Sequence, residues 1–79
     1  DLRATSRKLR ERSVRTLMTV ARLERAAATD LLASAGGSVK TAIVMSRLSL
    51  SRDAAIARLD GAGGHVARAL GEIDGEASR

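Results

Sequence analysis

The sequence predicts a small all-α bundle of about five short helices, and its composition gives the main reasons. The 79 residues include no Pro, Cys, Phe, Tyr or Trp, and the apolar side chains are mostly Ala and Leu. Ala and Leu are strong helix formers, whereas β-branched and aromatic residues favour strands. Because each aromatic side chain would add roughly 150–250 Å² of buried surface, we expect a thin core and modest stability for the chain alone.

The missing Cys and the short apolar runs exclude several classes of protein. Without Cys there are no disulfides, thiolate nucleophiles or thiolate metal sites. No apolar run is long enough for a membrane span or a signal peptide, so the expected location is cytoplasmic. The chain begins with Asp1 rather than Met, and both a fragment and a processed product remain open.

An internal repeat with a period of 27 residues organises the chain. Residues 23–43 align with residues 50–70, and ten of the 21 paired positions are identical. Two copies are too few for a solenoid and instead indicate two matching helix–Gly-Gly–helix corners. The glycines are expected to close left-handed, Schellman-type caps at the helix ends: Gly36, Gly37, Gly63 and Gly64.

Cap residues and apolar spacing predict helices at about 5–21, 24–35, 38–48, 52–61 and 65–73. Ser38 and Ser51 are expected N-caps, and His65, which takes the place of Ser38 in the second copy, is a poorer one. We therefore expect a basic connecting helix over residues 1–22, a helical domain over 23–73 and a disordered tail over 74–79.

The net charge of +5 lies entirely in the first third of the chain. Residues 1–25 hold eight basic and three acidic side chains, and the remaining residues balance six against six. An anionic partner is therefore expected to dock on this segment.

The first helix is the candidate anion site. Thr5 or Ser6 is predicted to be its N-cap, which would place Arg7 and Lys8 in the first turn. Cations there oppose the helix dipole at a cost of about 0.3–1 kcal/mol each. Together with the free N–H groups they would attract a phosphate. A solvated basic face is the simpler alternative. Nucleic acid is not favoured, because without aromatic residues only salt-sensitive backbone contacts remain.

Self-contained catalysis is not expected. The carboxylates are scattered, and there is one His and no H-E-x-x-H spacing. His65 is expected to be a surface residue, and the Gly-Gly pairs lack the patterns of a P-loop or a dinucleotide site. We therefore expect neither a metal nor a cofactor.

Two segments resemble the C-terminal end of bacterial N-acetylmuramic acid 6-phosphate etherases. The run LLASAGGSVKTAIVM is similar to the family pattern L-x-x-A-G-G-x-V-K-x-A-I-V-M, and GAGGHVARAL is similar to a second A-G-G-x-[VL]-x-x-A-L. Upstream, DLRATSRKLRER resembles D-[LV]-x-A-T-N-x-K-L-x-x-R, with Ser6 where the family usually carries Asn.

The resemblance implies a parent protein with a sugar isomerase (SIS) α/β domain that carries the catalytic carboxylates. That family of lyases cleaves the lactyl ether of N-acetylmuramic acid 6-phosphate to N-acetylglucosamine 6-phosphate and D-lactate, a step of amino sugar metabolism and peptidoglycan recycling. This chain would be its non-catalytic C-terminal module, similar to ubiquitin-associated (UBA-like) folds, which helps to complete the sugar-phosphate site and the homo-oligomer. The alternative is a free-standing UBA-like adaptor that binds protein or, weakly, nucleic acid.

Specific residues follow from this resemblance. In the related glucokinase regulatory protein a lysine of the matching segment is thought to approach the sugar phosphate, and the position carries over to Lys8. Thr5, Ser6 and Arg12 are expected to lie around it. Independently of the resemblance, the thin core and the helix spacing leave Val14, Met18 and Val44 beside the main apolar stripes. They are expected to pack on a parent domain or a second subunit, so the isolated chain is expected to self-associate.

Overall fold

The computed structural model describes residues 2–71, with side chains from Arg7 onward. It confirms the predicted all-α class, because the described part has five helices and no strand. In chain order the helices are α1 (Leu2–Val20), α2 (Arg25–Ser34), α3 (Val39–Leu48), α4 (Arg52–Gly61) and α5 (Val66–Ala69). The predicted last helix, 65–73, is thus a single turn, while Ile73 and the predicted tail 74–79 lie outside the described residues.

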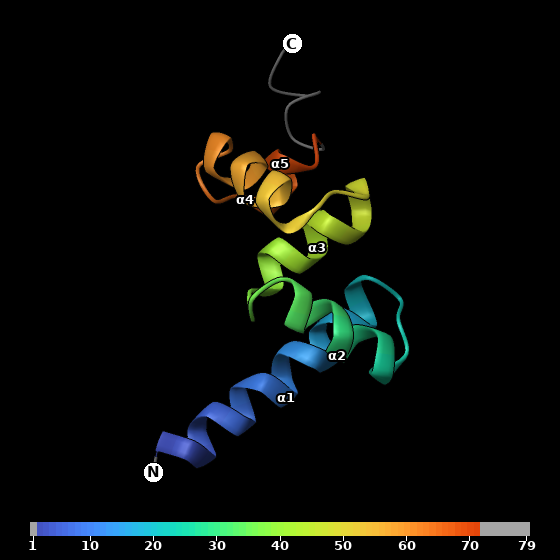
Figure 1. The fold of residues 1–79 in the computed structure, drawn as a ribbon, viewed down its shortest axis with the longest axis vertical. Helices are drawn as coiled ribbons and strands as arrows, with labels where there is room; N and C mark the ends of the chain where they lie inside the picture. The colour runs from blue at the N-terminus through green and yellow to red at the C-terminus, as the bar shows by residue number, and fades with distance from the viewer. Residues whose placement is uncertain (1, 72–79) are drawn as a thin grey trace.

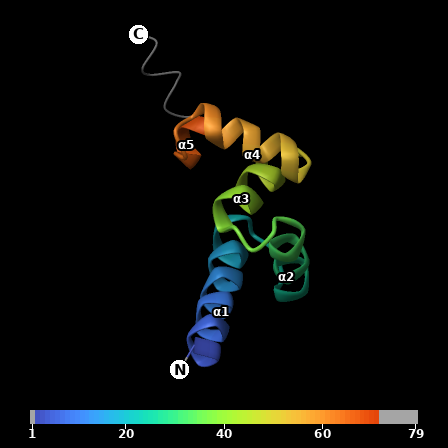
Figure 2. The same cartoon turned by 60° about the vertical axis from the view of Figure 1, so that its left-hand side comes forward.

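The helices form an elongated stack with α3 in the middle (Figure 1). α1 and α2 lie on one side of α3, α4 and α5 lie on the other, and the extents are 47 × 26 × 21 Å. Figure 2 shows the same order from a second direction, with the N-terminal half of α1 projecting beyond the rest of the stack.

Two hydrophobic clusters hold this stack together, and α3 contributes to both. The first cluster joins α1, α2 and α3, and its buried members are Val14, Leu17, Ala28, Leu32, Ala35, Ala42 and Ile43. The second cluster joins α3, α4 and α5, and its buried members are Val44, Ala55, Leu59, Ala62 and Ala69. Met45 of α3 packs against both clusters.

The second cluster is a copy of the first, displaced by the 27-residue period. Five members of the first cluster (Leu17, Ala28, Leu32, Ala35 and Ala42) become the five buried members of the second when 27 is added to their numbers. Leu17 and Val44, which correspond in this way, are the largest fully buried side chains. The repeat therefore extends upstream of residue 23 into α1. Its structural unit is three helices, and α3 is the third helix of one unit and the first of the next.

The first Gly-Gly corner ends α2 with a Schellman cap. Gly36 and Gly37 have φ angles of +70° and +87°. The Gly37 N–H donates to the Leu32 carbonyl at 2.9 Å, and the Gly36 N–H donates to the Ala33 carbonyl at 3.0 Å. These two bonds satisfy carbonyls that a helix C-terminus otherwise leaves without partners.

The second corner repeats this geometry at the end of α4. Gly63 and Gly64 have φ angles of +68° and +82°. Their N–H groups donate to the Asp60 and Leu59 carbonyls at 3.1 and 2.8 Å. Because the left-handed conformation strains residues with a Cβ atom, glycine is favoured at both corners.

Serine side chains cap the N-termini of α3 and α4. The Ser38 hydroxyl oxygen accepts a hydrogen bond from the Thr41 N–H at 3.2 Å. Ser51 does the same with the Ala54 N–H, also at 3.2 Å. His65 has the extended backbone of an N-cap before α5, but its side chain makes no cap hydrogen bond.

The expectation that Val14 and Val44 are available for docking is wrong. Val14 and Val44 are 3% and 0% exposed, and Met18 is half-buried against the first cluster. The chain's own helices cover these side chains because α2 folds over α1, and α4 and α5 fold over α3. The large apolar side chains that remain exposed are Leu9 (54%), Val20 (43%) and Ile56 (40%).

Candidate functional site

Three cations form a basic face on α1: Lys8, Arg12 and Arg15. Spacings of four and three residues put them on one side of a helix. All three are exposed, whereas Val14 and Leu17 on the other side of α1 are buried in the first cluster. The basic face therefore points away from the bundle.

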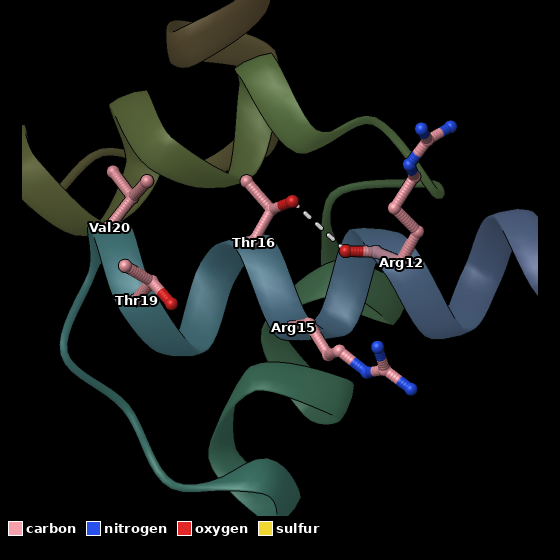
Figure 3. Close-up of a pocket in the computed structure, with 5 residues that line it drawn as sticks. All are labelled: Arg12, Arg15, Thr16, Thr19 and Val20. Atoms are coloured by element: carbon pink, nitrogen blue, oxygen red, sulfur yellow. Dashed lines mark hydrogen bonds between the residues drawn. The ribbon is translucent and has the colours of Figure 1, made fainter.

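A shallow hollow of about 330 Å³ lies on this same side of α1 (Figure 3). It is lined by Arg12, Arg15, Thr16, Thr19 and Val20. The Thr16 hydroxyl donates to the Arg12 carbonyl at 2.9 Å, which fixes that side chain along the helix. The guanidinium groups of Arg12 and Arg15 extend to opposite sides of the hollow.

The predicted N-cap of α1 is wrong. α1 begins at Leu2, so the backbone of Thr5 and Ser6 is helical and neither residue can be the cap. The segment before them, Leu-Arg-Ala, is made of strong helix formers, which lets the helix continue upstream. Lys8 is consequently the seventh residue of α1 and lies in its second turn, where backbone N–H groups already bond within the helix. Any anion bound at Lys8 is held by side chains rather than by a helix terminus.

The structure brings Lys8 and Arg12 together one turn apart on the exposed face. A lysine is a flexible point charge and an arginine is a planar fork of donors, and both bind phosphate oxygens. Both side chains are exposed to solvent, on the side of α1 away from the buried Val14 and Leu17. The side chains of Thr5 and Ser6 lie outside what the structure describes.

Other chemical groups are dispersed over residues 2–71. His65 is exposed beside the second corner, and no group of three or more His, Cys, Asp or Glu in this range could hold a metal ion. None of the helices in the described range is long and apolar enough to cross a membrane. One exposed ion pair, Arg25 to Glu11 at 3.3 Å, links α2 to α1.

Sequence reasoning missed a second concave surface, here called the corner groove, between α1 and the first Gly-Gly corner. It consists of two hollows of about 390 and 240 Å³, which share Arg10, Leu32 and Gly37 in their linings. Its lining comprises Leu9, Arg10, Ser13, Val14, Thr29, Leu32, Ala33, Gly36 and Gly37. The signal for it in the sequence is the 27-residue correspondence, which pairs Ser13 with the longer Lys40.

The equivalent place in the second unit is crossed by Lys40, whose ammonium group donates to the Gly64 carbonyl at 3.1 Å. Subtracting 27 from these numbers gives Ser13 and Gly37, both of which line the corner groove. The shorter Ser13 side chain therefore leaves open a space that Lys40 crosses in the second unit.

Replacing Ser13 with Lys should stabilise the chain. The new ammonium group is expected to reach the Gly37 carbonyl as Lys40 reaches Gly64, adding up to about 1 kcal/mol to the free energy of unfolding. Urea denaturation followed by circular dichroism measures the change. Ser13→Met supplies a stem of similar length without a donor and is the control. Equal effects of Lys and Met would show that the correspondence does not extend to this hydrogen bond.

No protein-family model matches the chain, and no solved structure matches it significantly. The chain is, however, 47% identical over 72 residues to an N-acetylmuramic acid 6-phosphate etherase of Deinococcus radiodurans, which covers 91% of the chain and 24% of that protein. The chain is related to these etherases. Enzymes with the same name from Halalkalibacterium halodurans and Salinibacter ruber are 42% and 44% identical over 94% and 89% of the chain.

The chain spans about a quarter of the length of the etherases that it matches. This coverage is consistent with the C-terminal region to which the sequence motifs assigned it. The predicted resemblance is therefore confirmed for a segment, whereas the activity named for the full-length etherases belongs to proteins about four times as long.

Proposed function

We propose that this chain is a non-catalytic module of an N-acetylmuramic acid 6-phosphate etherase-like lyase. In this proposal a SIS-type domain supplies the chemistry, and the module contributes a basic face to the sugar-phosphate site and surfaces for a homo-oligomer. The similarity to the etherases supports an etherase-like parent protein. The basic face supports a role of the module in binding the sugar phosphate.

One observation carries the phosphate part of the proposal: Lys8 and Arg12 are exposed on a side of α1 that the bundle does not use. The attraction between a cation and a phosphate grows when a neighbouring domain excludes water around the pair. The long α1 projects from the stack, so its N-terminal half can reach into a neighbouring domain while α2 to α5 stay outside (Figures 1 and 2).

Replacing Lys8 with Ala in the full-length protein tests this proposal. Loss of a charge-assisted hydrogen bond to phosphate should lower kcat/KM for the 6-phosphate substrate at least about tenfold. Use of an unphosphorylated analogue should change little, because that analogue never made the contact. Steady-state kinetics with both substrates gives the comparison.

Arg10→Ala is the matched control, because Arg10 is an exposed cation on the same helix that lines the corner groove instead of the basic face. If Lys8→Ala and Arg10→Ala had equally small effects, Lys8 would be a solvated surface charge that does not contact the phosphate. A Lys8→Ala defect of the same size for both substrates would also contradict phosphate recognition.

A further inference from the structure

We propose that two copies of this chain associate through α1 of one and α4 of the other, with Ile56 seated in the hollow on α1. This inference rests on the oligomeric part of the proposed function and supplies its interface. It shares Arg12 with the basic face but makes no use of Lys8, which lies outside the residues that line the hollow, so Lys8 alone is used to test phosphate binding.

The hollow has the form of a helix-packing site. Arg12, Arg15, Thr16 and Thr19 are spaced i, i+3, i+4 and i+7, the four positions that surround one inserted side chain in knobs-into-holes packing. Val20 adds an apolar wall at one end and is 43% exposed. Such a site suits a branched apolar side chain on another helix.

The internal repeat supports this reading of the surface. Adding 27 to the four positions gives four residues of α3: Val39, Ala42, Ile43 and Ser46. Ala42 and Ile43 are buried members of the first cluster, and Val39 packs against it. The corresponding face of α3 is thus already covered by helices of this chain, whereas on α1 the same face is exposed over the described residues.

α4 carries a surface complementary to the hollow. Ile56 is 40% exposed, and Asp53 and Asp60 lie three residues before it and four residues after it. This spacing places the three side chains on one side of α4, and all three are exposed. Ala55 and Leu59 are buried in the second cluster, so Ile56 lies at the edge of the buried side of α4 rather than opposite to it.

Charge favours Ile56 over the other exposed apolar side chains as the residue that occupies the hollow. Leu9 and Val20 lie on the basic α1, whereas Ile56 lies between two carboxylates. The guanidinium of Arg52, one turn before Ile56, lies beside Gly36 of the first corner. With Ile56 in the hollow, Asp53 and Asp60 would face Arg12 and Arg15. Exposed ion pairs contribute little affinity individually but fix register and exclude wrong partners. The contact is therefore expected to be weak and sensitive to salt.

A charge-swap experiment on the 79-residue chain tests the interface. One variant carries Arg12→Asp and Arg15→Asp, and a second carries Asp53→Arg and Asp60→Arg. Sedimentation equilibrium at high micromolar concentration and low salt should show that the native chain self-associates. Each variant alone should have its dissociation constant raised at least about tenfold by like-charge repulsion. An equimolar mixture of the two variants should regain association, because every α1–α4 contact between them pairs opposite charges.

Matched controls change the same amount of charge elsewhere. Arg7→Asp with Arg10→Asp alters α1 outside the hollow, and Glu24→Arg with Asp30→Arg alters exposed acids at α2. Both control pairs should keep native association, and circular dichroism should show native helix content in every variant. Ile56→Gln should weaken association without any change of charge.

Several outcomes would overturn the interface. These are a monomeric native chain, association unchanged in both swap variants, no recovery in the mixture, or equal loss in the control variants. The sugar-phosphate proposal is tested separately, since Lys8→Ala should leave self-association intact. A failed charge swap would likewise leave the kinetic effect of Lys8→Ala unaltered.

Discussion

Leu17→Ala should destabilise the chain by about 2–5 kcal/mol, the usual cost of truncating a buried leucine. Leu17 is 0% exposed and belongs to the first cluster, where α1 meets α2 and α3. The neighbouring alanines, Ala28, Ala35 and Ala42, have no side-chain freedom with which to fill the space that the truncation leaves. A small domain of this size has only a few kcal/mol of stability to lose. Thermal denaturation followed at 222 nm should therefore show a large fall in Tm.

Leu9→Ala is the matched control, with the same substitution in the same helix. Leu9 is 54% exposed, so its truncation should change the free energy of unfolding by no more than about 0.5 kcal/mol. Similar losses for the two variants would mean that the first cluster does not hold α1 to the bundle. The Leu17→Ala transition should also remain a single step, because α3 belongs to both clusters.

Much of the fold could be predicted because local signals agree with one another. Ala- and Leu-rich segments, serine caps and paired glycines each depend on neighbouring residues in the chain, and four of the five helices fall within about one residue of the predicted bounds at their C-terminal ends. The last helix does not, because Gly71, with a φ of +83°, follows its only turn. The spacing of apolar residues did not predict this early end, because that spacing continues through Leu70 to Ile73 on both sides of Gly71.

The local sequence pattern could not predict where α1 begins or that Val14 and Val44 are buried. Thr5 and Ser6 have cap chemistry, but a cap forms only where the helix ends, and the upstream residues are strong helix formers. Val14 and Val44 lie beside the main apolar stripes of their helices, yet both are buried. Their burial depends on α3 serving two three-helix units, an arrangement set by packing between helices distant in sequence.

The candidate site was predictable in composition but not in geometry. Counting charges located the basic segment, and the family motif singled out Lys8. The rotation of α1 about its axis decides which of its cations face away from the core. Leu17 is on the buried side, and this leaves Arg12 and Arg15 exposed beside the hollow. The 27-residue period holds this information, because it relates the exposed face of α1 to the buried face of α3.

Gly63→Val should cost about 2–3 kcal/mol of stability, because a β-branched residue in the left-handed region is strongly strained. Gly63 has a φ of +68°, and its N–H donates to the Asp60 carbonyl in the cap that ends α4. A Cβ atom at this position would meet no backbone atom, its nearest neighbour being the flexible His65 side chain at 3.6 Å. The loss should therefore come from the backbone conformation rather than from a steric clash. Chemical denaturation of the variant measures it.

Gly61 provides a control of opposite sign two residues away. It lies in the last turn of α4, it is not among the positive-φ glycines, and a Cβ atom there would meet nothing within 4 Å. Gly61→Ala should therefore stabilise the chain by about 0.5–1 kcal/mol, since alanine restricts the unfolded chain and favours the helix. Gly63→Ala, the same exchange at positive φ, should instead destabilise it by about 1–2 kcal/mol. Two alanine variants that shift stability in the same direction would refute the left-handed cap as the reason for glycine at this corner.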